Sequence, residues 1–286
     1  MRICLYSNHA AGGGLSVDHV TSVIEGAGHI VVRAIDDESD LPSRIDDADC
    51  VVVAGGDGTV ARAGHVLAGG PVPMAILPLG TANNIASSLD IHGDIERLAA
   101  RWHQGDVVKI DVGVVEVSGT AQRFLESVGC GLVTSCIAEG TAILAKDDPT
   151  SHLEDARDLY LETLKKLEPR RYEIALDGER IAKEFLLVEV LNTPAIGPKV
   201  QLTADVNAAD SFLSVVLLEE SDRDALMAYL TSLGSNGASP AGFRSWRVKT
   251  VEITGADRLH VDDRVIATDG VPLPIGIHPR SLAILA

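Results

Sequence analysis

The stretch Cys50-Val51-Val52-Val53-Ala54-Gly55-Gly56-Asp57-Gly58-Thr59 decides the fold, because in it an apolar strand runs directly into a glycine-rich turn. The same order returns where Met74 to Leu79 precede the turn Gly80-Thr81-Ala82-Asn83-Asn84. Glycine has no Cβ, so backbone N–H groups at such a turn can approach a phosphate closely. A helix that begins there adds unpaired N–H groups and the positive end of its dipole. Two such turns predict a site for a nucleotide polyphosphate and its metal.

Each turn by itself also fits an ordinary connection from a strand to a helix, since glycine is common at turns. The five-residue string and its partner together favour the phosphate site. The carboxylate of Asp57 can bind Mg²⁺ or take a proton from an attacking hydroxyl, while an Asx-type turn is the plainer alternative. No Gly-Lys-Ser/Thr follows either turn, so backbone N–H groups, helped by Thr59 and Thr81, must meet the phosphate charge.

Composition narrows the class of protein. The 286 residues suffice for two domains, and 46% hydrophobic residues allow a buried core. The net charge of −17 disfavours nucleic acid as a partner and a purely electrostatic grip on anionic lipid. The four cysteines, at positions 4, 50, 130 and 136, have no metal or disulfide spacing, which suits buried thiols. The first residues lack the apolar core of a signal peptide, so a cytoplasmic protein is predicted.

Strands and helices alternate up to residue 106. The predicted strands are 2–7, 30–35, 50–54 and 74–77, and the predicted helices are 16–27, 41–48, one ending at 67, and 94–103. This order predicts an α/β domain, residues 1–106, with a mainly parallel sheet covered on both faces. Ligands of such sheets bind beyond the carboxyl ends of the strands, where both turns lie.

Residues 107–286 are mostly β-branched and apolar runs. The predicted strands are 108–117, 123–128, 172–176, 185–191, 212–218 and 248–253, with one helix at 152–167. They predict a mainly β, sandwich-like second domain, whose last strand is able to return to the first. The runs 185–191 and 212–218 are either the core of this sandwich or the lining of a lipid pocket.

The two turns resemble signatures of the diacylglycerol kinase catalytic-domain family, which includes bacterial soluble lipid kinases and sphingosine-type kinases and is related to the NAD kinases. Gly55–Thr59 is similar to the family's ATP-phosphate loop, and Pro78–Ala86 is similar to its second signature, Gly-Thr-x-Asn-Asp. Further matches are Asn8 with Gly12–Gly14 (Asn-Pro-x-x-Gly), Ile110–Gly113 (Ile-Asp-x-Gly), Asp210–Leu213 (Asp-Gly-x-Leu) and Asp269-Gly270 (Asp-Gly-Glu). The resemblance covers nearly the whole chain.

The resemblance implies that ATP and Mg²⁺ bind in an interdomain cleft and that the γ-phosphoryl group passes to a lipid hydroxyl. The residues then expected to hold ATP are Asn8, Gly55, Gly56, Gly58, Thr59, Gly80, Thr81 and Asn83, with Asn83 bracing the second turn. Asp57 and Asp210 are expected at the metal, and Asp57 is also the favoured base. Further expected cleft residues are Asn84, Asp111, Glu126 and Asp269.

Three positions depart from the family pattern. Val271 stands where the terminal motif has the glutamate that acts as base in related bacterial lipid kinases, and valine cannot accept a proton. Asn84 replaces the second aspartate of Gly-Thr-x-Asn-Asp, so another negative charge is missing. Glu126 stands where an asparagine is common, which makes it a candidate ligand or substitute base.

The sequence therefore predicts an ATP- and Mg²⁺-dependent lipid kinase that acts on a diacylglycerol-like acceptor. Two alternatives stay open: a nucleotide- or lipid-binding protein with impaired catalysis, and a kinase of a soluble acceptor such as NAD. The expected partners are a nucleotide and a lipid substrate, with no nucleic acid, at most peripheral membrane contact, and a homodimer left open.

Overall fold

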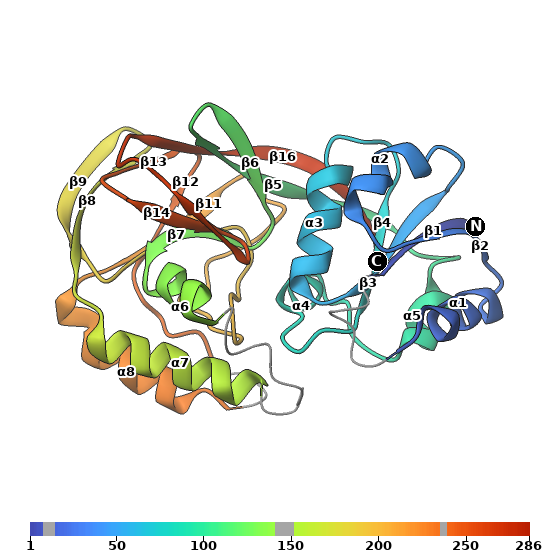
Figure 1. The fold of residues 1–286 in the computed structure, drawn as a ribbon, viewed down its shortest axis with the longest axis horizontal. Helices are drawn as coiled ribbons and strands as arrows, with labels where there is room; N and C mark the ends of the chain where they lie inside the picture. The colour runs from blue at the N-terminus through green and yellow to red at the C-terminus, as the bar shows by residue number, and fades with distance from the viewer. Residues whose placement is uncertain (8–14, 141–151, 235–238) are drawn as a thin grey trace. The chain divides into compact units, whose positions relative to one another are not determined.

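The computed structural model describes residues 1–7, 15–140, 152–234 and 239–286 (Figure 1). The loop predicted to hold Asn8 and Gly12–Gly14 lies outside the described residues. The chain divides into two compact units, Met1–Val112 with Pro279–Ala286, and Gly113–His278. The sequence places the boundary earlier, at residue 106.

The first unit is an α/β layer structure. Its strands are β1 (Arg2–Ser7), β2 (Ile30–Ile35), β3 (Cys50–Gly55) and β4 (Met74–Pro78), and its helices are α1 (Val17–Gly26), the 3₁₀ turn η1 (Glu38–Asp40), α2 (Leu41–Arg44), α3 (Asp57–Leu67), α4 (Asn84–Ser88) and α5 (Ile95–Arg101). The sheet order is β2-β1-β3-β4, all parallel, and the end of β16 (Leu273–Leu285) adds to β4 in parallel. Every residue of β3 is buried, as expected for a strand covered on both faces. The predicted mainly parallel sheet is confirmed.

Helix α2 is shorter than the helix predicted over residues 41–48. The residues that follow it bind the start of β1 instead of continuing the helix. Arg2 Nε donates to the carbonyl oxygen of Asp47 at 2.7 Å, and the Arg2 N–H donates to Asp49 Oδ2 at 2.7 Å. This contact joins the acidic segment to the strand and ends the helix early.

Two stacked histidines lie beside α5 in the first unit. The rings of His29 and His103 lie 4.2 Å apart. His29 is buried, and its Nε2–H donates to the carbonyl oxygen of Ala99 at 2.9 Å. Its Nδ1 has no hydrogen-bond partner within the described residues. Burial lowers the pKa of His29 below its ordinary value of 6.5, because a charged imidazolium is poorly solvated there.

Because His29 is buried, we expect the free energy of unfolding to fall in mild acid. Because the pKa of His29 is lower in the folded than in the unfolded chain, the unfolded chain binds the proton first. The contribution of neutral His29 to the free energy of unfolding is fully present above pH 6.5. It is lost as the pH falls through the pKa that His29 has in the folded chain. Denaturant unfolding of the wild type and of His29→Asn between pH 8 and about pH 5 checks this. We expect a steeper decline for the wild type; parallel declines would contradict it.

In its described residues, the second unit contains two antiparallel β layers, three α-helices and one 3₁₀ turn. Its elements are β5 (Val107–Val117, shared with the first unit), β6 (Thr120–Phe124), β7 (Ser127–Gly131), α6 (Leu132–Gly140), α7 (His152–Lys166), β8 (Arg170–Leu176), β9 (Glu179–Phe185), β10 (Leu187–Leu191), β11 (Leu213–Leu218), η2 (Glu220–Asp222), α8 (Arg223–Ser232), β12 (Ser245–Val248), β13 (Val251–Thr254), β14 (Arg258–Val261), β15 (Arg264–Ala267) and the first part of β16. One sheet runs β12-β11-β10-β7-β14-β15, and the other runs β16-β13-β8-β9 with the hairpin β5–β6 attached to β16. The predicted β-rich second domain is confirmed.

Two hydrophobic cores hold these layers together. One lies between the two sheets, and the other lies between the β12–β15 sheet and helices α6, α7 and α8. Val188 and Val190 of β10 face the first core, while Leu187 and Leu191 face the second. The apolar runs 185–191 and 212–218 are therefore core rather than a lipid pocket, and the first of them is two strands with a break at Leu186.

Two predicted strands are also broken, and a distant carboxylate holds each break. The run 123–128 divides between β6 and β7, where Asp262 accepts the Glu126 N–H at 2.8 Å. The run 248–253 divides between β12 and β13, where Asp177 accepts the N–H groups of Lys249 and Thr250 at 3.0 and 2.9 Å. In both places the carboxylate takes N–H groups that a continuous strand would give to its neighbour.

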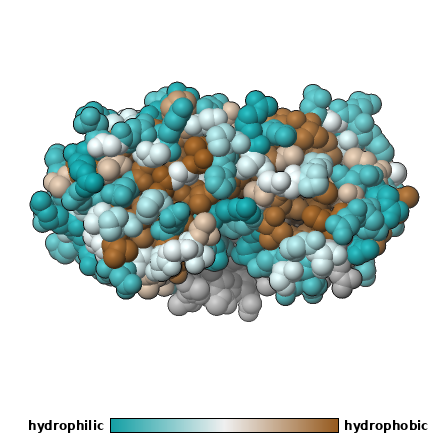
Figure 2. Space-filling model, turned by 90° about the horizontal axis from the view of Figure 1, so that it is seen from above, coloured by the Kyte–Doolittle hydropathy of each residue, from teal (hydrophilic) through white to brown (hydrophobic). Residues whose placement is uncertain are grey.

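On the face that Figure 2 shows, apolar side chains lie among polar ones. In the left half of Figure 2, which belongs to the second unit, apolar side chains lie open among polar ones. The four cysteines are free and buried, and burial raises the pKa of Cys50 and of Cys136 to about 12. Within the described ranges, no helix has the length and hydrophobicity needed to cross a bilayer.

Candidate functional site

The two glycine turns pack against each other, backbone on backbone. The Leu79 N–H donates to the carbonyl oxygen of Gly55 at 3.0 Å. A Cβ added at Gly80 would lie 2.4 Å from the Cα of Gly56, and one added at Gly56 would lie 3.1 Å from the Cα of Gly80. Glycine at Gly80 is therefore a steric requirement, and the two predicted turns are in direct backbone contact.

Asp57 links the two turns. It is the first residue of α3, and Gly56 before it is an extended N-cap with no side-chain cap. Asp57 is half-buried, and its Oδ1 accepts the backbone N–H of Ile85 in α4 at 2.9 Å. One oxygen of the predicted catalytic carboxylate is thus bonded to the second turn's helix.

Asn83 fixes the second turn from inside. Its backbone is left-handed, with φ 52° and ψ 44°. Its Oδ1 accepts the Gly80 N–H at 2.9 Å, and its Nδ2 donates to the carbonyl oxygens of Gly80 at 2.7 Å and Pro78 at 3.3 Å. The side chain spans the turn and holds its peptide groups in one arrangement.

The two threonines predicted at the phosphates have different surroundings. Thr81 is exposed on the second turn. Thr59 is 1% exposed, its N–H donates to the carbonyl oxygen of Gly56 at 3.0 Å, and its Oγ1 has no hydrogen-bond partner in the described part of the chain. Asn84, the first residue of α4, is buried. Only Thr81 presents its hydroxyl openly.

The Ile110–Gly113 motif has a structural use. Asp111 is fully buried, and its Oδ1 accepts the Arg280 N–H at 2.7 Å, where Arg280 has a φ of 49°. A Cβ at Gly113 would lie 2.0 Å from the ring of Phe124. This carboxylate therefore secures the backbone of β16, and Gly113 leaves room for an aromatic ring. A role of Asp111 in a cleft stays a prediction.

The remaining acidic candidates belong to the second unit. Asp210 Oδ2 accepts both Arg247 Nε and Nη2, at 3.1 and 3.0 Å, and its Oδ1 accepts the Phe212 N–H at 3.0 Å. Asp269 is exposed in the segment between β15 and β16, and Val271 beside it is 47% exposed. Asp210 is thus part of an ion pair and an Asx turn.

Among the described residues, no group of three or more His, Cys, Asp or Glu side chains has the arrangement of a metal site. Asp210 also forms an ion pair with Arg247, with 3.0 Å between Oδ2 and Nη2. Metal binding by Asp57 and Asp210 stays a prediction, and no chemical step below depends on it.

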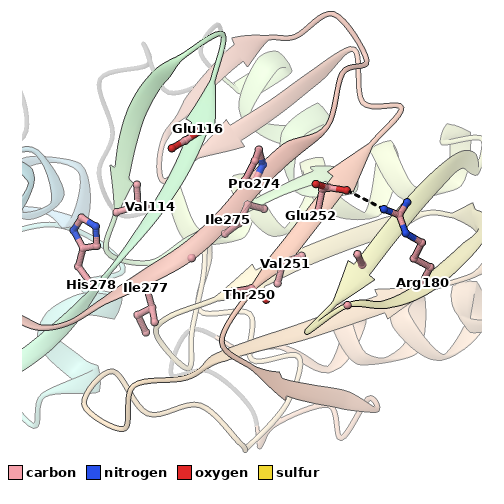
Figure 3. A pocket seen from close by; sticks show the side chains of 13 residues that line it. Val114, Glu116, Arg180, Thr250, Val251, Glu252, Pro274, Ile275, Ile277 and His278 are labelled. Atoms are coloured by element: carbon pink, nitrogen blue, oxygen red, sulfur yellow. Dashed lines mark ion pairs between the residues drawn. The ribbon is translucent and has the colours of Figure 1, made fainter.

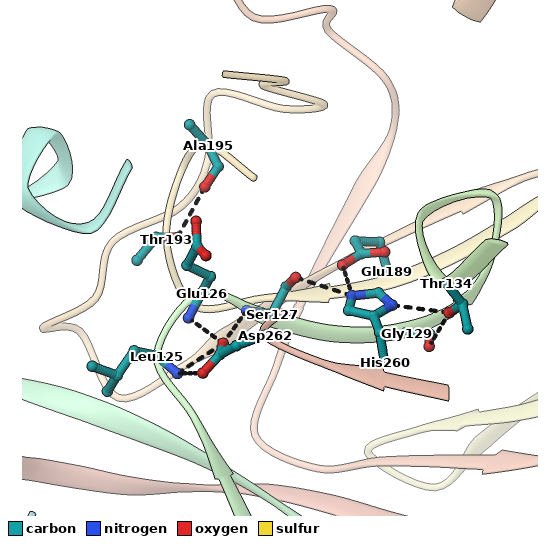
Figure 4. Close-up of polar contacts among 10 residues, drawn as sticks. All are labelled: Leu125, Glu126, Ser127, Gly129, Thr134, Glu189, Thr193, Ala195, His260 and Asp262. Carbon is teal, nitrogen blue, oxygen red and sulfur yellow. Dashed lines mark hydrogen bonds and ion pairs between the residues drawn. The ribbon is translucent and has the colours of Figure 1, made fainter. Parts of the chain in front are cut away.

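A buried polar cluster in the second unit escapes prediction from the sequence (Figure 4). Thr134 Oγ1 donates to the carbonyl oxygen of Gly129 at 2.8 Å, so it must accept from Nδ1–H of His260 at 2.9 Å. His260 Nε2 then meets Glu189 Oε1 at 3.0 Å, with both side chains fully buried. Glu189 sits within an apolar strand and His260 is isolated in the sequence, so no spacing signals their contact.

One hollow of the second unit lies against β16, β13 and β8 (Figure 3). It measures about 550 Å³, and Arg180 and Glu252 form an ion pair of 3.7 Å at its rim. Its lining includes Ile275, Gly276 and Ile277. It contains none of the predicted site residues, so it is not the candidate site.

The chain is similar to known proteins. Residues 3–115 match the diacylglycerol kinase catalytic domain, and residues 157–286 match the YegS C-terminal NAD kinase beta sandwich-like domain. A diacylglycerol kinase of Mycobacterium tuberculosis is 25% identical over 218 residues, which is 75% of this chain and 67% of that relative.

Two solved structures share the fold. A diacylglycerol kinase from Bacillus anthracis has a TM-score of 0.75 at 20% identity, over 99% of this chain and 96% of the other. An NAD kinase from Archaeoglobus fulgidus, solved in complex with ATP, has a TM-score of 0.56 at 12% identity, over 100% and 94% of the two chains.

Proposed function

The chain belongs to the diacylglycerol kinase catalytic-domain family of the NAD kinase superfamily, and on that premise we propose that it transfers the γ-phosphoryl group of ATP to a hydroxyl of a diacylglycerol-like lipid. The relatives' names support the view that this chain is a kinase. The identities of its nucleotide and of its acceptor are part of this proposal. The observation that carries it is the contact between the two glycine turns at Gly56 and Gly80.

The geometry of the first unit suits a polyphosphate. The uncapped beginning of α3 offers N–H groups that have no acceptor inside the helix. Thr59 Oγ1 is buried without a partner among the described residues, which costs free energy. A phosphate oxygen would supply that hydrogen bond. Gly55, Gly56, Gly58, Gly80 and Thr81 complete the proposed cradle, and bound ATP would supply the phosphoryl group.

Asp57 is the proposed catalytic carboxylate. The Ile85 N–H fixes its Oδ1, so the orientation of the whole group is set before a substrate arrives. We assign its Oδ2 the proton of the acceptor hydroxyl. A bond between acceptor oxygen and γ-phosphorus then forms as the bond to the leaving ADP oxygen breaks, and ADP keeps that electron pair. Positioning and charge neutralisation provide most of the acceleration of phosphoryl transfer.

The alternative of impaired catalysis rests on Val271, which stands where the family motif has a glutamate. The Val271→Glu variant separates the two readings, because the position is 47% exposed and accepts a charge without burial. With Asp57 as the base, we expect turnover to stay nearly unchanged. A rise towards the roughly 10²–10⁴-fold that general-base help provides would show that the wild type lacks its base.

The acceptor is tested with γ-labelled ATP and purified full-length protein. The reactions contain dioleoylglycerol in mixed micelles, NAD, or no acceptor. We expect label in the lipid product and none in NADP. Label in NADP alone would establish the soluble-acceptor alternative, and nucleotide binding without transfer to any acceptor would establish the impaired one.

A further inference from the structure

Glu189 and His260 are two buried titratable side chains that the proposed transfer does not use. They lie on β10 and β14, the strands on either side of β7. Gly129 of β7 is the register partner of both residues. Because glycine has no Cβ, it leaves room for the two side chains to meet, and Glu189 Oε1 lies 3.0 Å from His260 Nε2 (Figure 4). A Cβ at Gly129 would lie 2.7 Å from Glu189 Oε2, so the contact requires glycine at this position.

The bonds at the far side of the imidazole ring show where one of its protons lies. The Thr134 hydroxyl has a single proton, which it donates to the carbonyl oxygen of Gly129 at 2.8 Å, since a carbonyl only accepts. Thr134 Oγ1 therefore accepts from His260 Nδ1–H at 2.9 Å. Ser127 Oγ lies 3.3 Å from His260 Nε2, farther than Glu189 Oε1. Nδ1 thus holds a proton, and Glu189 is the closest partner of Nε2.

Two arrangements place a proton between His260 Nε2 and Glu189 Oε1. In an ion pair, Nε2–H donates to a carboxylate. In a neutral pair, the O–H of a carboxylic acid donates to the lone pair of Nε2. With no proton in this contact, two acceptor atoms would face each other at 3.0 Å. Either arrangement therefore binds one proton more than a free carboxylate and a neutral imidazole.

The second oxygen of Glu189 favours the neutral pair. Oε2 is buried and has no hydrogen-bond partner among the described residues. A buried ion pair offsets the desolvation of its charges only when further hydrogen bonds satisfy the remaining lone pairs. An uncharged carboxyl group costs much less to bury than a carboxylate does. A carboxylic acid thus suits a side chain that is fully buried with one oxygen unbonded.

The other titratable groups nearby supply no positive charge for a carboxylate. They come from the elements packed around β10, and they are Cys130 of β7, Cys136 of α6, Tyr160 of α7 and Glu126 just before β7. Burial raises the pKa of Cys130 and of Tyr160, so both are uncharged at neutral pH. In the described part of the chain, the ion-pair partner within reach of Glu189 is His260.

We propose that Glu189 is a neutral carboxylic acid in the folded chain and that it begins a pH-sensitive relay of hydrogen bonds, which holds the start of α6 on the sheet. The relay runs from Glu189 O–H to His260 Nε2, from His260 Nδ1–H to Thr134 Oγ1, and from the Thr134 hydroxyl to the carbonyl oxygen of Gly129. Thr134 lies in the first turn of α6. This inference does not depend on the proposed kinase activity.

Loss of the Glu189 proton at alkaline pH reverses the relay. A hydroxide ion takes the proton and becomes water, and the electron pair of the O–H bond stays on Oε1. The carboxylate then accepts from Nε2–H, because the imidazole proton moves from Nδ1 to Nε2. Nδ1 becomes an acceptor, so the single proton of the Thr134 hydroxyl turns to it and the bond to the Gly129 carbonyl is lost. One proton thus controls a bond between α6 and β7.

Glu189→Gln tests whether the folded chain holds this proton, because its amide N–H donates to Nε2 at every pH. A free glutamate loses its proton at about pH 4.3, so above this pH the folded wild type binds one proton more than the unfolded chain. Rising pH then favours unfolding. We expect the unfolding equilibrium constant of the wild type to rise about tenfold per pH unit relative to Glu189→Gln, from about pH 6 until the relay reverses. Denaturant unfolding at each pH measures this ratio.

Glu179→Gln is the matched control, an exposed change on β9 in the same unit. It is expected to follow the pH dependence of the wild type. The proton on His29 affects the wild type and both variants equally, so it cancels from each comparison.

Nitrogen NMR of the full chain with isotope-labelled histidine tests the direction of the relay. At neutral pH we expect an uncharged His260 ring with its proton on Nδ1, and at alkaline pH an uncharged ring with its proton on Nε2. In Glu189→Gln the proton stays on Nδ1 at both pH values.

Three results would overturn the inference. A charged His260 ring at neutral pH would establish the ion pair, and an Nε2 proton on a neutral ring at that pH would contradict the direction of the relay. Equal pH dependence of the wild type and Glu189→Gln would show that Glu189 holds no extra proton. If Glu189→Gln fails to fold, the NMR of the wild type decides. None of these measurements involves phosphoryl transfer, so their failure leaves the proposed function unaffected.

Discussion

Gly80→Ala is expected to lower the affinity for ATP by about tenfold or more. A factor of ten corresponds to about 1.4 kcal/mol of lost binding free energy. The new Cβ would lie 2.4 Å from the Cα of Gly56 and 2.9 Å from Asn83 Oδ1, so the two turns must move apart. Overpacking of this kind typically costs about 1–3 kcal/mol of stability. Titration of ATP by calorimetry and denaturant unfolding measure the two effects.

Gly26→Ala is the matched control for this change. Gly26 is the last residue of α1 in the same unit, and an added Cβ there meets nothing within 4 Å. The control is expected to bind ATP as the wild type does. If Gly80→Ala also bound ATP with wild-type affinity, the contact between the turns would have no part in nucleotide binding.

Asp57→Asn is expected to lower turnover by about 10²–10⁴-fold, the contribution of a general base. The asparagine oxygen can still accept the Ile85 N–H that Asp57 Oδ1 accepts at 2.9 Å, so the turns should stay joined. Stability and ATP affinity should therefore change much less than turnover. Asp57→Ala loses the hydrogen bond as well, and we expect it to weaken ATP binding in addition to turnover.

The control for the loss of charge is Glu25→Gln, an exposed change on α1. Initial rates with saturating ATP and lipid separate turnover from binding for all three variants. Full activity of Asp57→Asn would rule out Asp57 as the base and leave it only its link to Ile85.

The parts of the fold that the sequence predicts correctly are those with local causes. The strand and turn at Cys50–Thr59 follow from a run of apolar residues that ends in glycine. The first unit's strands follow the same logic, and β3 begins at the predicted residue, Cys50. The family signatures reach further, because the diacylglycerol kinase resemblance at Gly55–Thr59 and Pro78–Ala86 is confirmed by the family matches.

The errors have causes that lie far away in the sequence. The strand predicted over 123–128 is wrong because Asp262 binds Glu126 across 136 residues. The strand predicted over 248–253 is wrong because Asp177 binds Thr250 across 73 residues. The spacing of apolar residues cannot predict such a contact, because it indicates which residues are buried and not which group each N–H bonds to.

The same limit applies to the site. The sequence identifies Asp57 as a carboxylate in a turn, but its bond to Ile85 appears only when both turns are placed together. Asp111 and Asp210 match family motifs, yet one secures Arg280 and the other binds Arg247. A motif names the residue, while the contacts of its side chain come from the folded unit.

The most direct test of the phosphate cradle is a map of ATP binding by backbone amide NMR on the isotope-labelled full chain. We expect saturable shifts that are largest at the amides of Gly55–Thr59 and Gly80–Ile85, and loss of these shifts in Gly80→Ala. Saturable binding with its largest shifts elsewhere, or no saturable shift at all, would contradict the claim that these two turns hold the phosphates of ATP.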